Sequence, residues 1–219
     1  MTGPLSPDLL LLGYQSGVFP MSESRTDTDI FWVDPKRRGV FDLAKFHVSR
    51  SLARRLRKAD YQATIDQDFA GVVQACADRD ETWINASIER TYLDLFRAGF
   101  AHSQEIWQDD HLVGGVYGVA IGGAFFGESM FSHATDGSKL ALAYLIHRLR
   151  AAGFSLFDTQ FLTPHLASLG AEEISRKAYQ SKLRKALLLE ADFCAPHVPR
   201  PDELLSDLKG PSGLQQTRD

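Results

Sequence analysis

The sequence predicts an α+β protein in which a mixed central sheet is flanked by helices. Apolar and polar residues alternate over residues 101–107 and 112–120, on either side of Asp109-Asp110, as in an antiparallel hairpin. A third strand pattern, at residues 124–131, follows Gly122-Gly123. Helical patterns precede and follow this meander, and the composition, 44% hydrophobic and 24% charged, is ordinary for a globular chain.

The first elements are predicted to form a small N-terminal domain, residues 1–38. Ser6-Pro7-Asp8 is typical of a helix start and Gly17 of a helix end, so a short helix is expected over residues 5–17. A strand is expected at residues 30–33. Because so short a segment cannot bury a core of its own, we expect it to pack against the rest of the chain.

A larger domain is predicted over residues 39–201. Its first helix begins after Ser49, a suitable N-cap, and extends to Lys58. The further expected elements are, in order, a strand at 61–65, helices at 69–77 and 88–98, the three strands above, a helix at 137–152 that ends before Gly153, a strand at 154–158 and a helix at 175–189. Residues 202–219 are expected to be a flexible tail.

Charge, cysteine content and hydropathy exclude several classes of protein. The formal net charge is −4, so a polyanion would need a local basic patch. Cys76 and Cys194 show no CxxC or CxxH spacing, which argues against a disulfide framework or structural zinc and for a reducing compartment. No basic segment precedes the apolar residues 9–12, and the apolar run 113–126 is too short to span a bilayer. We therefore expect a cytoplasmic protein without membrane contact.

Two carboxylates lie among apolar residues. Glu128 falls in the apolar and small residues 113–131, and Asp158 ends a short apolar strand. A buried carboxylate is costly unless it has a partner or a function. Gln160 would share a face with Asp158 in an extended segment, and an amide oxygen beside a carboxylate suits an amine or another cation. The alternative is that each carboxylate pairs with a buried arginine or caps a turn.

A basic stripe and a tryptophan are candidates for nucleic-acid contacts. The helix after Ser49 carries cationic residues at helical spacing with no acid before Asp60, and these could follow phosphates. The stripe consists of Arg50, Arg54, Arg57 and Lys58. Trp83 lies between polar residues and could stack on a base. The alternatives are a solvated helix face for the stripe and a core anchor for Trp83.

Several catalytic motifs are absent from the sequence. Ser129 lacks the second glycine of a GxSxG nucleophile motif. The seven histidines show no HxxxH or HxH spacing, and the phosphate-loop and dinucleotide-binding motifs are missing. The sequence therefore does not favour a serine hydrolase, a metal centre or a nucleotide site of these kinds.

These features occur together with a series of motifs in a fixed order. The motifs lie at residues 14–20, 46–51, 82–84, 101–107, 112–118, 127–132, 158–160 and 165–171. With them the chain resembles, over nearly its whole length, the bacterial leucyl/phenylalanyl-tRNA–protein transferases. Each motif alone is weak, but their order and compatible spacing make the resemblance specific.

The resemblance implies a fold and an activity. The fold would be a small N-terminal domain followed by a domain like the GNAT acetyltransferases. The activity would be transfer of Leu, Phe or, less readily, Met from aminoacyl-tRNA to the α-amine of proteins that begin with Arg or Lys, which marks them for N-end-rule degradation. No metal or cofactor is implied, and we expect a monomer.

The resemblance also implies roles for residues of this chain. Trp83 matches the tryptophan that stacks on the terminal adenosine of the tRNA. Met21 occupies the place of a second tryptophan found in many relatives, and its thioether should hold adenine less firmly. The polar catalytic centre would comprise Glu128, Asp158 and Gln160; the aminoacyl side-chain pocket Val116, Met130, Leu142 and Leu145; and the acceptor-stem contacts Arg50, Arg54 and Arg57, to which we add Lys58.

The reaction implied is aminolysis of an activated ester. We expect Gln160 to accept a hydrogen bond from the attacking amine, while Asp158 polarises this contact and holds the basic acceptor residue. Glu128 would add negative potential that favours cationic N-termini.

Two other functions share some of these features. A GNAT-type acyl-CoA N-acyltransferase needs a glycine-rich turn for pyrophosphate, which residues 132–139 do not provide, and Asp136 would repel that group. A non-catalytic RNA-binding module would account for Trp83 and the basic stripe but not for the acidic centre.

Overall fold

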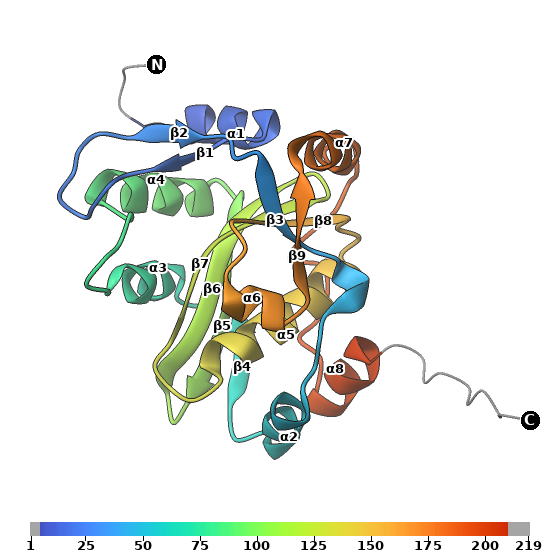
Figure 1. The fold of residues 1–219 in the computed structure, drawn as a ribbon. Coiled ribbons are helices and arrows are strands. Elements are labelled where there is room, and N and C mark those ends of the chain that lie inside the picture. The colour runs from blue at the N-terminus through green and yellow to red at the C-terminus, as the bar shows by residue number, and fades with distance from the viewer. Residues whose placement is uncertain (1–4, 210–219) are drawn as a thin grey trace, which may run out of the picture.

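The computed structural model describes residues 5–209, which form two sheets surrounded by helices (Figure 1). The main sheet has seven strands in the order β4-β5-β6-β7-β8-β3-β9. Neighbouring strands are antiparallel except β7 and β8, which are parallel. The strands are β3 (Arg37–Phe41), β4 (Gln62–Ile65), β5 (Ala101–Gln108), β6 (His111–Ile121), β7 (Ala124–Ser132), β8 (Leu156–Gln160) and β9 (Ala171–Ser175). The predicted α+β class with a mixed sheet flanked by helices is confirmed.

Helices cover both faces of the main sheet (Figure 1). One face packs against α1 (Pro7–Ser16), α3 (Phe69–Ala77), α4 (Ala86–Arg97) and α7 (Arg176–Ala186). The other packs against α2 (Arg50–Lys58), α5 (Gly137–Ala151) and α8 (Pro201–Leu208). Adjacent residues of a strand enter different cores, as Phe125 and Phe126 do, because side chains alternate across a strand.

The N-terminal elements pack directly onto the rest of the molecule. Ser6 caps the start of helix α1, where its hydroxyl accepts a hydrogen bond from the Leu9 N–H at 3.3 Å, and Gly17, with a φ of +85°, caps its end. The strands β1 (Phe19–Met21) and β2 (Phe31–Val33) form a separate two-stranded sheet. Leu10 and Tyr14 belong to the same buried cluster as residues of α3 and α4. The domain boundary expected at residue 38 falls inside β3, a strand of the main sheet.

The parallel strands β7 and β8 separate after a short stretch of pairing. Their register runs only from Ala124 opposite Leu156 to Phe126 opposite Asp158. Strand β7 continues to Ser132 beyond this pairing, so one of its edges is open where β8 diverges. This divergence leaves space between two strands in the middle of the sheet.

Several elements differ from the sequence prediction. The sequence did not indicate β1, β3, β9 or the short helix α6 (Pro164–Ser168), and the helix expected to end at residue 189 ends at Ala186. The expectation of a flexible tail is wrong for residues 202–208, which lie in α8, because Leu204, Leu205 and Leu208 are buried against the core. Residues 210–219 of that tail lie outside the described residues. None of the helices in residues 5–209 is long and apolar enough to cross a membrane.

Candidate active site

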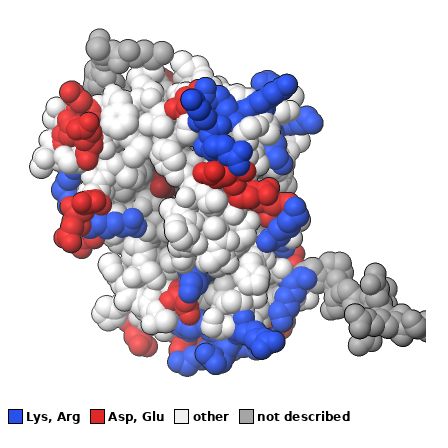
Figure 2. Space-filling model, viewed as in Figure 1, with Lys and Arg blue, Asp and Glu red and all other residues white. Residues whose placement is uncertain are grey.

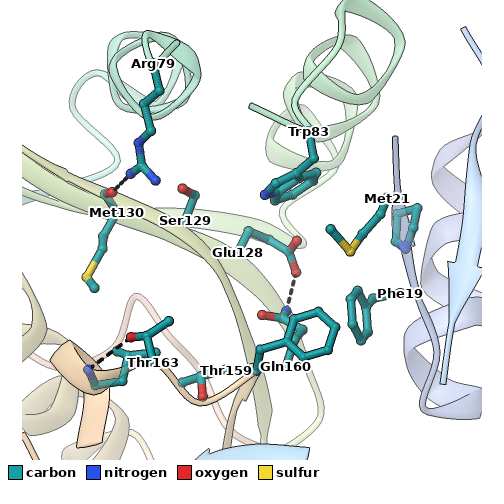
Figure 3. A pocket seen from close by; sticks show the side chains of 13 residues that line it. Phe19, Met21, Arg79, Trp83, Glu128, Ser129, Met130, Thr159, Gln160 and Thr163 are labelled. Carbon is teal, nitrogen blue, oxygen red and sulfur yellow. Dashed lines mark hydrogen bonds between the residues drawn. The ribbon is translucent and has the colours of Figure 1, made fainter. Parts of the chain in front are cut away.

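A cavity with a volume of about 390 Å³ lies where β7 and β8 diverge. Four parts of the chain line it (Figure 3). They are β1 with Phe19, Pro20 and Met21; the loop before α4 with Arg79 and Trp83; β7 with Glu128, Ser129 and Met130; and the segment from β8 into α6 with Thr159, Gln160, Phe161, Thr163 and Leu166. Residues that are far apart in the sequence therefore share one space.

A second, smaller cavity of about 80 Å³ adjoins the first. Glu128, Met130 and Gln160 line both, so they stand at the junction. The inner walls of the smaller cavity are apolar and include Val116, Leu142 and Phe157. Of the four residues predicted to form a side-chain pocket, Val116, Met130 and Leu142 line this cavity; Leu145 is fully buried in the core behind it and is not a lining residue.

Glu128 is held at the junction by three hydrogen bonds. Its Oε1 accepts from the Tyr14 hydroxyl at 2.7 Å and from the Gln160 amide nitrogen at 3.0 Å, and its Oε2 accepts from the Tyr92 hydroxyl at 2.6 Å. The pKa of Glu128 is raised to about 7: burial is the main cause and the nearby Asp158 adds to it, while the hydrogen bonds from the two tyrosines act in the opposite direction. Near neutral pH the carboxyl group is therefore partly ionised.

Gln160 has an unusual backbone at the end of β8. Its φ is +56°, a left-handed conformation that few non-glycine residues adopt and that is often found at functional sites. Its N–H donates to Asp158 Oδ1 at 2.9 Å, and its side-chain nitrogen donates to Glu128. The side-chain oxygen has no hydrogen-bond partner among the described residues. Gln160 can therefore present an acceptor oxygen to a ligand in the cavity, although the extended geometry assumed from the sequence does not hold at this residue.

Asp158 is fully buried and lines neither cavity, although its neighbours Thr159 and Gln160 line both. Both its oxygens are engaged by Arg38, with Nη2 to Oδ2 at 2.7 Å and Nε to Oδ1 at 2.9 Å, and Oδ2 also accepts from the Tyr179 hydroxyl at 2.7 Å. The Arg38 guanidinium is itself stacked between the rings of Phe19 and Tyr179, 4.5 Å from each centroid. The alternative of a buried arginine partner is thus the one realised for Asp158. The expectation that Asp158 holds the acceptor's basic residue is wrong, because its oxygens are already occupied.

The aromatic and basic candidates lie in two places. Trp83 and Met21 both face the larger cavity, beside the carboxylate of Glu128 (Figure 3). The stripe on α2 is exposed, within the band of Lys and Arg along the lower edge in Figure 2. Within it Lys58 pairs with Asp60 at 2.6 Å. Arg50, Arg54 and Arg57 have no such partner among residues 5–209.

Four side chains that the sequence did not assign complete the site. They are Tyr14 and Tyr92 on Glu128, and Arg38 and Tyr179 on Asp158. Tyr14 was visible as part of the motif at residues 14–20, but no local pattern connects any of the four to its carboxylate.

A group of three potential metal ligands lies away from both cavities. Asp66 and His102 are paired at 2.8 Å, and the thiol of Cys194 is 3.8 Å from the same carboxylate oxygen. None of the three lines the cavities between β7 and β8, so this group takes no part in the arrangement around Glu128.

Comparison with known proteins agrees with the resemblance drawn from the motifs. Residues 40–184 match the family model for leucyl/phenylalanyl-tRNA protein transferase, and residues 3–36 match the model for the N-terminal domain of the same proteins. The leucyl/phenylalanyl-tRNA–protein transferase of Ruegeria sp. (strain TM1040) is 62% identical over 201 residues, covering 92% of this chain and 96% of the relative. The leucyl/phenylalanyl-tRNA–protein transferase of Ruegeria pomeroyi is 63% identical over 191 residues, covering 87% of this chain and 91% of the relative.

The alignment with a solved structure of FemX covers 77% of this chain and 66% of the FemX chain, with a TM-score of 0.51 and 10% sequence identity. At this level of identity, the similarity concerns the fold alone. Together with the relatives, the fold and site define an aminoacyltransferase. The chain belongs to the leucyl/phenylalanyl-tRNA–protein transferase family.

Proposed function

We propose that this chain transfers Leu, Phe or, less readily, Met from aminoacyl-tRNA to the N-terminal α-amine of proteins that begin with Arg or Lys, marking them for N-end-rule degradation. The observation that carries the proposal is the pair of adjoining cavities with Glu128 and Gln160 at their junction. The larger cavity would take the terminal adenosine between Trp83 and Met21. The smaller would take the aminoacyl side chain, which places the ester carbon beside Gln160.

The smaller cavity suits an apolar side chain of modest size. A cavity of about 80 Å³ is several times the roughly 10–15 Å³ that one water needs, so several heavy atoms fit. Away from Glu128 and Gln160 at the junction, its inner walls are apolar, which favours an apolar donor side chain over a charged one. A narrow mouth would in addition exclude side chains branched at Cβ.

The chemistry requires positioning more than activation. The α-amine nitrogen attacks the ester carbonyl carbon, the bond to the ribose oxygen breaks, and one proton passes from the amine to the departing oxygen. An α-amine has a pKa near 7.7–8.0, so roughly a tenth is already neutral at pH 7, whereas a lysine side chain near 10.4 is far less available. The free oxygen of Gln160 would hold the amine against the ester.

The carboxylates would then have separate roles. Glu128 supplies negative potential in the cavity, which favours an acceptor that begins with Arg or Lys and disfavours one that begins with Asp or Glu. Asp158 is a positioning residue, because it fixes the backbone N–H of Gln160 without facing the cavity.

The tRNA itself would be held largely through its phosphates. The exposed Arg50, Arg54 and Arg57 on α2, with Lys58, are suited to the acceptor stem, so affinity should fall steeply with salt. We place the reaction in the cytoplasm, where charged tRNA is found. We expect a monomer to suffice, because a single chain lines both cavities.

The deciding experiment is transfer of radiolabelled Leu or Phe from charged tRNA to a peptide that begins with Arg. A matched peptide that begins with Asp and an assay with acetyl-CoA as donor are run in parallel. Label on the Arg peptide alone is the expected result. Acetylation without transfer from tRNA would instead favour an acyl-CoA N-acyltransferase and overturn the proposal.

A further inference from the structure

We propose that Arg79 binds the phosphate group that joins the terminal adenosine of the donor to the nucleotide before it. This inference rests on the function proposed above and adds a contact on the donor strand. Arg79 lies in the loop between α3 and α4, four residues before Trp83, and both side chains line the larger cavity. Figure 3 shows Arg79 at the edge of the cavity nearest Met130 and Ser129.

The guanidinium of Arg79 is fixed but not neutralised. One of its nitrogens donates to the backbone carbonyl of Met130, on the part of β7 that lies beyond the pairing with β8. Arg79 is exposed, and among the described residues no carboxylate lies within ion-pair distance of it, even though Asp78, Asp80 and Glu81 are its near neighbours in the sequence. Since a guanidinium has five N–H donors, most of them remain available to a ligand.

The charge distribution of the cavity favours an anion at this position. Arg79 and Glu128 are the charged residues among those that line the larger cavity. Glu128 is held by two tyrosines and Gln160, and it forms no ion pair with Arg79, so the cation is not the direct partner of that carboxylate. Arg79 thus lies at the rim of the cavity, and none of the carboxylates in residues 5–209 forms an ion pair with it.

The position of the adenosine identifies the anion. With the base between Trp83 and Met21 and the ester beside Gln160, the 5′ side of the ribose must leave the cavity past its rim. The first group on that side is a phosphate, which the planar guanidinium of arginine binds well. A protein acceptor that begins with Arg or Lys would be repelled from the same place, so Arg79 would also keep the donor and acceptor paths apart.

The test compares two small donors that differ by this phosphate. They are 3′-O-phenylalanyl-adenosine, which has none, and the dinucleotide in which a cytidine is joined through one phosphate to the same aminoacyl-adenosine. We expect Arg79→Gln to lower kcat/KM for the dinucleotide by about 10- to 100-fold, the effect of losing a hydrogen-bonded charge, and to leave the nucleoside donor unchanged. Arg79→Lys should keep part of the effect.

Charged tRNA provides a second readout. Loss of one phosphate contact on a single strand should reduce the slope of log KM against log salt concentration by about 0.7 in Arg79→Gln. Arg97→Gln is the matched control, because Arg97 is an exposed arginine on the neighbouring helix that already pairs with Asp94, and it should behave as wild type with every donor. If the small donors are not used, the salt slope alone decides.

Equal losses for both small donors would show that Arg79 only holds the loop to β7, and an unchanged salt slope would show that it contacts no phosphate; either result overturns the inference. A wild-type protein that transfers from no donor at all would instead refute the proposed function. If the wild-type protein labels the Arg peptide and the Arg79→Gln variant labels it equally well from charged tRNA, only the role of Arg79 is refuted.

Discussion

Removal of the Asp158 charge is predicted to weaken the fold and the reaction together. In Asp158→Asn, Arg38 would keep its charge with a side chain only 1% exposed and no opposite charge beside it. Breaking a buried ion pair from one side costs about 3–5 kcal/mol. A chain of this size loses about 2–4 °C in Tm per kcal/mol, so we expect a decrease of roughly 6–20 °C in a thermal unfolding experiment followed by circular dichroism.

Activity gives the second half of the same prediction. Well below the Tm of the variant, kcat should fall because the backbone of Gln160 is less firmly held, while KM for charged tRNA should change little. Asp94→Asn is the control, since Asp94 and Arg97 form an exposed pair and its loss should change stability by no more than about 1 kcal/mol. The double variant Arg38→Met/Asp158→Leu should recover much of the stability but not kcat. An Asp158→Asn protein with the Tm and kcat of wild type would refute this reasoning.

Three further variants test the other parts of the site. The folded-state pKa of Glu128, about 7, lies above its ordinary value, so the contribution of Glu128 to stability is complete only below that ordinary value and is lost as pH rises through 7. The difference in Tm between Glu128→Gln and wild type should therefore be more favourable to the variant at pH 8 than at pH 5. Trp83→Ala should raise KM for charged tRNA by about 5- to 150-fold, the range for one base stacked on an aromatic ring, with a smaller change in kcat. Leu142→Ala should shift the ratio of kcat/KM for Phe to kcat/KM for Leu in favour of Phe by about 10-fold or more, measured in a competition between the two charged tRNAs. An unchanged ratio would exclude the smaller cavity as the side-chain pocket.

The sequence predicted best those elements that are determined by local patterns. The meander β5–β7 and helix α5 were predicted to within a few residues, because their apolar residues alternate or recur along one continuous segment. Strand β3 was missed, since it is short, begins with two arginines and contains Gly39. Strand β9 was missed because Glu172 and Glu173 give it no apolar pattern. Both strands exist through pairing with distant segments rather than through their own composition.

The site was predicted in part for the same reason. The family resemblance grouped Glu128, Asp158 and Gln160 in one centre, and the hydrogen bonds of Gln160 to both carboxylates show that the three side chains are neighbours. The sequence could not give the partners of those carboxylates, because Tyr14 and Tyr92 meet at Glu128 only after α1 and α4 have packed on the sheet. The left-handed backbone of Gln160 leaves no mark in the sequence either, since glutamine is not a residue that favours it.

The N-terminal elements contribute directly to the candidate site. Tyr14 donates to Glu128, the carbonyl of Gly17 accepts from Arg38 at 3.1 Å, and Phe19 stacks on the same guanidinium. Arg38 balances the charge of Asp158, whereas Glu128 has no cationic partner within ion-pair distance among the described residues. Of the two carboxylates, Glu128 is therefore the one that lacks an ion-pair partner within residues 5–209. The N-terminal segment acts on both carboxylates, because the Tyr14 hydroxyl holds Glu128 and the segment helps to bury the arginine that neutralises Asp158.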